Sequence, residues 1–339
     1  MAKQSGKTYE QIMADLRRKT YSPVYFLMGD EPYYIDKISD FIENNILEES
    51  EVDFNLSVLY GRDVTIDTVV NAAKRYPMMA EYQVVLVKEA QQIKDWDALS
   101  YYLTKPLSST ILCFCYKYGK PDGRKKWTQE LNKQAVVFES KKLYENQVGA
   151  WISSYLTENQ TRITEKAEVM LTEFLGTDLS KIANELDKLL ITMPSDKKQI
   201  TPELIEKNIG ISKDFNVFEL QDALIRRDVL KANRIIRYFG DNKKANPIQM
   251  VLNQLFNFFS NLMLYYYMPD KSSATVASEL KINPYFTKDY ANAARSFDAW
   301  KTMRTISWIR ETDARSKGID DTGTDVSDLL KELVFKILH

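Results

Sequence analysis

A change of pattern near residue 143 constrains the fold of this chain more than any other feature of its sequence. Before it, short apolar runs at 24–28, 84–87, 111–115 and 136–138, and an extended piece at 54–61, are separated by segments of helical periodicity. Such alternation predicts a parallel sheet covered on both faces. After residue 143 the apolar spacing is helical throughout. The sequence therefore predicts an α/β fold followed by an all-α fold.

The length and composition describe an ordinary folded protein with more than one domain. A chain of 339 residues suggests two or three domains. Three are placed at 1–143, 144–212 and 213–339, since a polar stretch at 194–203 precedes a new helix capped by Asn216. The net charge of −1 excludes a strong overall basic field. No apolar leader or spanning segment is found, so we expect a cytoplasmic protein without membrane contact.

Few residues of this chain are suited to catalysis or to metal binding. The one histidine, His339, is the last residue, which argues against histidine triads and histidine metal clusters. Cys113 and Cys115 lie two residues apart in a predicted strand, so both point to the same face, and we expect buried, reduced thiols. The sequence predicts no catalytic residue and no metal site.

Neither candidate phosphate loop is complete. The segment Ser5-Gly6-Lys7-Thr8 ends like a P-loop, but Met1 stands at the first glycine position and no strand precedes it. After the first predicted strand, where a phosphate loop belongs, the chain has Gly29, Asp30 and Glu31, with one glycine, no lysine and two carboxylates. These carboxylates would repel a polyphosphate. We expect a degenerate phosphate loop and no bound cofactor, while a divergent NTPase using Lys7 is the alternative.

Lys88 strengthens that expectation. It ends the third predicted strand, where an ATPase of this layout would have a Mg²⁺-binding aspartate. A lysine cannot ligate a hard cation.

A basic loop at 116–127 is the candidate nucleic-acid contact. Its cations include Lys120, Arg124, Lys125 and Lys126, with Tyr118 and Trp127 among them. Such a loop can contact a phosphate backbone, and it can equally be a solvated connection between a strand and a helix. Both interpretations stay open at this point.

A methionine pair stands out between a predicted helix and a predicted buried strand. Met78 and Met79 follow Pro77 in the segment RYPMMAEY. Methionines at the surface would present soft apolar side chains to a hydrophobic pocket. The alternative is that they fill the core of the domain.

Five segments, taken together and in order, resemble one protein family across nearly the whole chain. They are VYFLMGDEPYYIDKI, PMMAEYQVVLVKEA, IANELDKLL, NVFELQDALIRRD and DARSKG. The family is the delta subunit of bacterial DNA polymerase III, the clamp-opening subunit of the sliding-clamp loader. The resemblance implies an AAA+-like α/β domain, a small helical lid and a helical collar domain through which the loader assembles.

The resemblance also implies a function without intrinsic ATP hydrolysis, within the DNA polymerase III holoenzyme. Its implied partners are the sliding clamp (beta), the gamma/tau motor subunits, delta-prime and primer-template DNA. The family's clamp-binding wedge corresponds here to Met78 and Met79, where leucine and phenylalanine are frequent in the family. A nucleic-acid module acting through the basic loop is kept beside the NTPase as an alternative.

Overall fold

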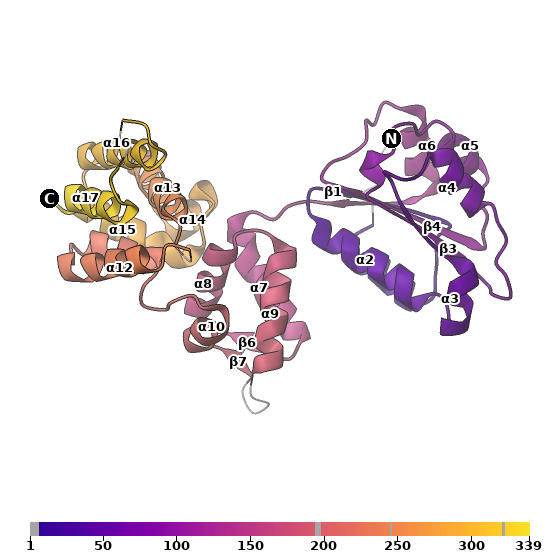
Figure 1. Ribbon diagram of the computed structural model, residues 1–339, viewed down its shortest axis with the longest axis horizontal. Coiled ribbons are helices and arrows are strands. Elements are labelled where there is room, and N and C mark those ends of the chain that lie inside the picture. Colours follow the sequence, from indigo (N-terminus) through magenta and orange to yellow (C-terminus); the bar gives the residue numbers. More distant parts are fainter. Residues whose placement is uncertain (1–6, 194–197, 245, 321–322) are drawn as a thin grey trace. The chain divides into compact units, whose positions relative to one another are not determined.

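The computed structural model describes residues 7–193, 198–244, 246–320 and 323–339, and the chain forms two compact units. The first unit contains the residues up to Leu143 together with Asp178–Ser180. All other residues belong to the second unit. In Figure 1 the first unit is drawn mainly in indigo and purple, and the second runs from magenta to yellow.

A five-stranded parallel sheet forms the centre of the first unit (Figure 1). Its strands are β1 (Val24–Gly29), β2 (Leu56–Tyr60), β3 (Gln83–Lys88), β4 (Thr110–Lys117) and β5 (Val136–Ser140), in the spatial order β2-β3-β4-β1-β5. Every neighbouring pair is parallel. The predicted parallel α/β sheet is confirmed.

Helices cover both faces of this sheet. They are α1 (Tyr9–Arg17), α2 (Pro32–Asn45), α3 (Glu49–Asn55), α4 (Ile66–Ala73), α5 (Leu99–Thr104) and α6 (Lys126–Gln134), with a short 3₁₀ turn, η1 (Ala90–Gln92). Strand alternation divides the core into two layers. Val24 and Phe26 pack with the buried residues of α4, α5 and α6, while Tyr25 and Leu27 pack with those of α1 and α2. Both cysteines are buried and free in the α1–α2 layer.

The predicted extended piece at 54–61 is wrong at its start. Phe54 and Asn55 end helix α3, and β2 begins only at Leu56. Two local contacts keep the backbone helical: the side chain of Glu51 accepts a hydrogen bond from the N–H of Glu48, and Asn55 Nδ2 donates to the carbonyl of Glu51. The position of Asn55 matters for the candidate site described below.

The second unit consists mainly of helices. They are α7 (Glu145–Glu158), α8 (Glu165–Leu175), α9 (Leu179–Thr192), α10 (Pro202–Ile209), α11 (Val217–Ile225), α12 (Val229–Asp241), α13 (Ile248–Tyr267), α14 (Ser273–Leu280), α15 (Thr287–Ser296), α16 (Ala299–Ser316) and α17 (Val326–Leu338), with the 3₁₀ turn η2 (Pro284–Phe286). The first two residues of α9 belong to the first unit. One apolar core joins α11 to α17, and α13 contributes the most residues to it.

The expectation of helices alone after residue 143 needs one correction. Two short strands, β6 (Arg162–Ile163) and β7 (Gln199–Ile200), pair in parallel. Two residues are too few to show a period of two, so the sequence pattern carries no signal for them. Ile200 is completely buried, which explains why this small sheet is stable inside the helical unit.

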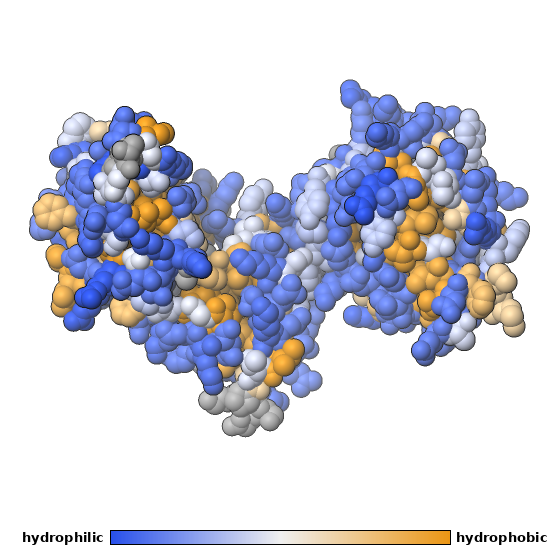
Figure 2. Space-filling view, viewed as in Figure 1, coloured by the Kyte–Doolittle hydropathy of each residue, from blue (hydrophilic) through white to orange (hydrophobic). Residues whose placement is uncertain are grey.

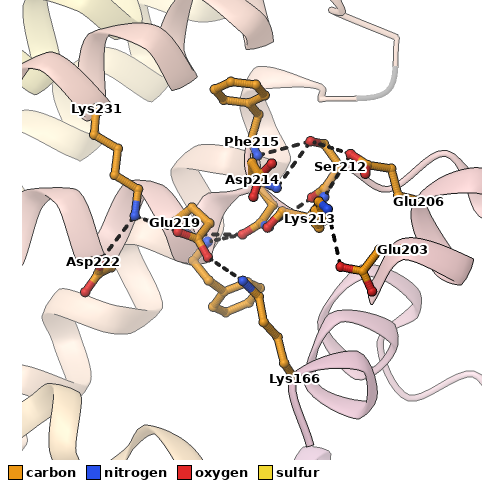
Figure 3. A network of polar contacts seen from close by, with 12 residues as sticks. Lys166, Glu203, Glu206, Ser212, Lys213, Asp214, Phe215, Glu219, Asp222 and Lys231 are labelled. Carbon is orange, nitrogen blue, oxygen red and sulfur yellow. Dashed lines mark hydrogen bonds and ion pairs between the residues drawn. The ribbon is translucent and has the colours of Figure 1, made fainter. Parts of the chain in front are cut away.

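A network of polar contacts connects the helices on either side of residues 210–216 (Figure 3). The carboxylate of Glu219 on α11 contacts Lys166 of α8 at 3.1 Å and Lys231 of α12 at 2.6 Å. The hydroxyl of Ser212 donates to Glu206 of α10 at 3.2 Å. Asn216 caps α11 as predicted, because its Oδ1 accepts from the N–H groups of Phe218 and Glu219.

The three-domain division at 1–143, 144–212 and 213–339 stays a prediction. Apart from Asp178–Ser180, the structure separates the residues up to Leu143 from those after it, and it does not divide the second unit at residue 212. In the described ranges, no helix has both the length and the apolar character needed to cross a membrane.

Candidate functional site

The loop between α4 and β3 carries the methionine pair. Helix α4 ends at Ala73 and β3 begins at Gln83, so Met78 and Met79 lie in the middle of the connection. Met78 is 60% exposed and Met79 is fully exposed. The two side chains therefore do not fill the core, which was the alternative for this segment.

Met79 has an unusual backbone conformation. Its φ is +54°, in the left-handed region, which costs a residue with a Cβ about 1–2 kcal/mol. A conformation of this kind persists only where surrounding contacts hold it. The loop must therefore be fixed by other residues.

Asn55 supplies one of these contacts, from the end of α3. Its Oδ1 accepts from the N–H of Met78 at 2.7 Å, and its Nδ2 donates to the carbonyl of Met78 at 3.0 Å. The same Nδ2 donates to the carbonyl of Glu51 at 3.0 Å. The Asn55 side chain is only 3% exposed. Sequence reasoning missed this residue, because 23 positions separate it from Met78.

Gln83 holds the other end of the loop. From the first position of β3, its Nε2 lies within hydrogen-bond reach of the carbonyls of Ala72, Ala73 and Arg75, which terminate α4. It is also 2.8 Å from Thr110 Oγ1 on β4. Backbone groups at a helix end need such partners when they are buried. Two buried amides thus hold the backbone of this connection, Asn55 at Met78 and Gln83 where α4 ends.

The exposed groups around this loop form an apolar surface. We define it by Phe54, Tyr76, Met78 and Met79, all of which are exposed. Phe54 directly precedes Asn55 in α3, the residue whose side chain binds the backbone of Met78. Figure 2 shows hydrophobic atoms gathered at the lower right of the first unit, where Figure 1 draws α3. Large exposed apolar groups at one place indicate a binding surface.

The turn after β1 is the segment that the sequence predicts to be a degenerate phosphate loop. Gly29 has φ +130°, and a Cβ there would lie 1.9 Å from the carbonyl oxygen of Ser140 on β5, so only glycine fits. Asp30 is exposed, whereas Glu31 is buried. Gly29 therefore serves the packing of β1 against β5.

Glu31 occupies the N-terminus of α2. Its Oε1 accepts from the N–H of Tyr33 at 2.9 Å. Burial raises the pKa of this carboxyl, and hydrogen bonds from the N–H groups of Tyr33 and Leu179, both in the first unit, oppose the rise. A helix N-terminus binds anions, and in a P-loop that anion is a phosphate. Here a carboxylate of the chain itself takes this place.

Lys88 at the end of β3 is paired with a carboxylate rather than free. Its Nζ lies 2.7 Å from Glu43 of α2. Burial lowers the pKa of Lys88, but Glu43 and Asp40 raise it by more, so the ammonium is stabilised.

The N-terminal Gly-Lys-Thr segment falls partly outside the described residues, which begin after Gly6. Lys7 forms an ion pair with Asp15 at 2.6 Å. Thr8 caps α1, with its hydroxyl accepting from the N–H of Gln11. These two side chains are engaged in starting a helix.

The basic loop holds part of its charge in internal pairs. Lys120 contacts Glu139 at 2.9 Å, and Arg124 contacts Asp122 at 2.8 Å. Lys125 and Lys126 are exposed and form no ion pair with any residue that the structure describes. Trp127 is buried and stacks on Trp96 with ring centroids 4.7 Å apart, so it belongs to the core and is not available for stacking on a base.

Across the described ranges, no three His, Cys, Asp or Glu side chains are grouped to hold a metal ion. The first unit is thus a parallel α/β domain in which Glu31 occupies the N-terminus of α2 and exposed apolar side chains lie at the loop before β3.

Comparisons with known proteins identify the family of this chain. A family model for the DNA polymerase III delta subunit matches residues 25–141, and one for the C-terminal domain of the same subunit matches residues 214–334. The DNA polymerase III subunit delta of Bacillus subtilis (strain 168) is 28% identical over 337 residues, covering 95% of this chain and 94% of that protein. The chain belongs to the DNA polymerase III delta subunit family.

A solved structure shares the fold. The Bacillus subtilis DNA clamp loader delta protein superposes with a TM-score of 0.60 at 23% identity, over 98% of this chain and 99% of that chain. The RuvB Holliday junction branch migration motor of Thermotoga maritima matches with a TM-score of 0.37 at 10% identity, over 84% of this chain and 83% of that chain.

Proposed function

We propose that this chain is the clamp-opening subunit of a bacterial clamp loader, and that Met78 and Met79 bind the sliding clamp. The observation that carries the proposal is a fully exposed methionine on a loop whose backbone is held by buried amides. Water does not favour such exposure, so a partner with an apolar pocket explains it. Burying each methionine contributes about 1.5–3 kcal/mol.

The proposed mechanism is mechanical. A ligand shifts an equilibrium only by the difference between its affinities for the two states. The methionine pair must therefore bind the clamp more tightly with its subunit interface open than with it closed. Binding energy alone then stabilises the open ring for loading on primed DNA.

ATP would act through neighbouring subunits in this proposal. Glu31 holds the helix N-terminus that a phosphate would need, and Lys88 is paired with Glu43, which supports a subunit without ATP hydrolysis. We propose gamma/tau motor subunits and delta-prime as neighbours, with the last helices of the chain supplying the contacts. Family membership supports this assembly and a cytoplasmic location.

Clamp binding is tested by calorimetry with the purified sliding clamp of the same organism. We expect Met78→Ala/Met79→Ala to weaken binding by roughly a hundredfold or more, because two buried side chains are lost. The variant should keep its folding stability, since neither side chain packs in the core. Met303→Ala, which removes an exposed methionine of α16, is the matched control. Unchanged affinity of the loop variant, or loss of its fold, would contradict the proposal.

Contact with primer-template DNA is a separate part of the proposal. Lys125 and Lys126 support it, because both are exposed and available for phosphates, while Lys120 and Arg124 first have to leave their carboxylates. Such contacts must weaken as salt rises, since counterions compete for the phosphates.

A further inference from the structure

We propose that Asn55 is a positioning residue for clamp binding: its buried side-chain amide fixes the backbone of Met78 so that Met79 is presented to the clamp. This inference rests on the proposed clamp-binding function of the methionine pair. It assigns to α3, which contributes neither methionine, a direct part in the site.

The side chain of Asn55 hydrogen-bonds to the backbone of Met78 in the way that a neighbouring β-strand would. Asn55 contacts both the N–H and the carbonyl of Met78, at 2.7 and 3.0 Å. Its second amide hydrogen goes to Glu51, within its own helix. Because Asn55 is buried, water cannot replace these contacts at no cost. The backbone of Met78 is thus hydrogen-bonded to α3, although Met78 lies in a surface loop.

The hydrogen bonds between Asn55 and Met78 determine where the side chain of Met79 points. Met79 follows Met78 directly and has a left-handed backbone. Without a fixed neighbour, the loop would relax towards ordinary backbone conformations and its apolar side chains would fold onto the protein surface. A loop that is ordered before binding loses less conformational entropy when the clamp binds. Asn55 therefore raises affinity without touching the clamp.

Asparagine is suited to this place by its chemistry. Its amide offers a donor and an acceptor at the same distance from the backbone. Aspartate has the same shape but no donor, so it would face the carbonyls of Met78 and Glu51 with a charge. Alanine removes both contacts. Comparing the two variants separates the loss of the donor alone from the loss of the whole amide.

The first test measures clamp affinity for Asn55→Ala and Asn55→Asp by calorimetry. We expect each to weaken binding by roughly tenfold: alanine loses both hydrogen bonds to Met78, whereas aspartate loses the one to its carbonyl and repels that carbonyl with a charge. Asn44→Ala is the matched control, because Asn44 is an exposed asparagine of α2 whose amide donates to the carbonyl of Asp40 in the same helix. Clamp affinity equal to wild type in both Asn55 variants would overturn the inference.

A double-mutant cycle distinguishes positioning from a general structural effect. In the Met78→Ala/Met79→Ala background, Asn55→Ala should change clamp affinity no further, because there is no methionine pair left to position. An equal loss in both backgrounds would show that Asn55 acts elsewhere. If Met78→Ala/Met79→Ala alone leaves affinity unchanged, the proposed function itself fails, which is a different outcome.

Hydrogen exchange tests the inference in the wild-type protein, independently of how the variants fold. The amide of Met78 should be protected, since Asn55 accepts its hydrogen, although the residue lies in a surface loop. Asn55→Ala should remove that protection while the amides of β3 keep theirs. Exchange of the wild-type Met78 amide at the rate of a free peptide would refute the proposed role.

Discussion

The turn after β1 and the loop before β3 differ in the side chains that they leave exposed to solvent. In a parallel sheet these segments lie at opposite edges, the turn at the carboxyl ends of the strands and the loop at the amino ends. At the carboxyl edge, where α/β proteins usually bind ligands, Glu31 occupies the helix N-terminus. At the amino edge, Asn55 and Gln83 satisfy the backbone but leave two methionines in water. The comparison teaches that the proposed clamp surface is indicated by exposed apolar side chains and not by the edge where α/β proteins usually bind ligands.

The largest expected effect comes from Gly29→Ala at the carboxyl edge. A Cβ there would lie 1.9 Å from the carbonyl oxygen of Ser140, in a backbone conformation that alanine disfavours. We expect the free energy of unfolding to fall by about 2–4 kcal/mol, measured by urea denaturation. Gly123→Ala, where an added Cβ meets nothing within 4 Å, is the control and should change stability by less than about 0.5 kcal/mol.

The same variant sharpens the contrast between the two edges. Under conditions where Gly29→Ala is folded, its affinity for the clamp should equal that of wild type. A large loss of clamp affinity in the folded variant would mean that the two edges are not independent.

An intermediate effect is expected from Glu31→Gln, in the dependence of stability on pH. Burial raises the pKa of Glu31 in the folded protein above its ordinary value of 4.5. Between these two values the folded state binds more protons than the unfolded state, so this group's stabilising contribution is lost as the pH rises. Glutamine keeps the acceptor for Tyr33 but does not titrate.

The measurement is urea denaturation at a series of pH values from 4 to 8. The decrease in stability with rising pH should be smaller in Glu31→Gln than in wild type. Glu49→Gln, at an exposed position of the same unit, serves as the control. Parallel pH profiles for wild type and Glu31→Gln would contradict the assigned environment of this carboxyl.

The smallest effect is expected in the basic loop. Lys125→Glu/Lys126→Glu should weaken binding of the assembled loader to primer-template DNA by roughly three- to tenfold at low salt, and by less at high salt. Clamp affinity should stay unchanged. Lys94→Glu/Lys105→Glu makes the same charge change at exposed positions elsewhere in the first unit. An equal loss in both double variants would indicate a general effect of charge rather than contacts at this loop.

Much of the architecture was predictable from local patterns. The apolar runs at β1, β3, β4 and β5 predicted the parallel sheet, because strands buried on both faces are apolar throughout. The cap at Asn216 and the placement of Cys113 and Cys115 on one face of the sheet were equally visible. The short strands β6 and β7 were not, since two residues carry no period.

The features of the candidate site were also predictable only in part from the sequence. The incomplete phosphate loop and the methionine pair were evident in the sequence, because each depends on neighbouring residues. The burial of Trp127 was not, since an aromatic residue beside lysines looks the same whether it packs inside or stacks outside.

By itself the sequence determined the order of strands and helices, the absence of a complete phosphate loop and the presence of two adjacent methionines. Only the tertiary structure decided that Met78 and Met79 face solvent, that Asn55 holds their backbone, and that Glu31 fills the end of α2. The reason is physical. Periodicity and capping act over a few residues, whereas the contact between Asn55 and Met78 joins the ends of two elements that meet only when the sheet has formed.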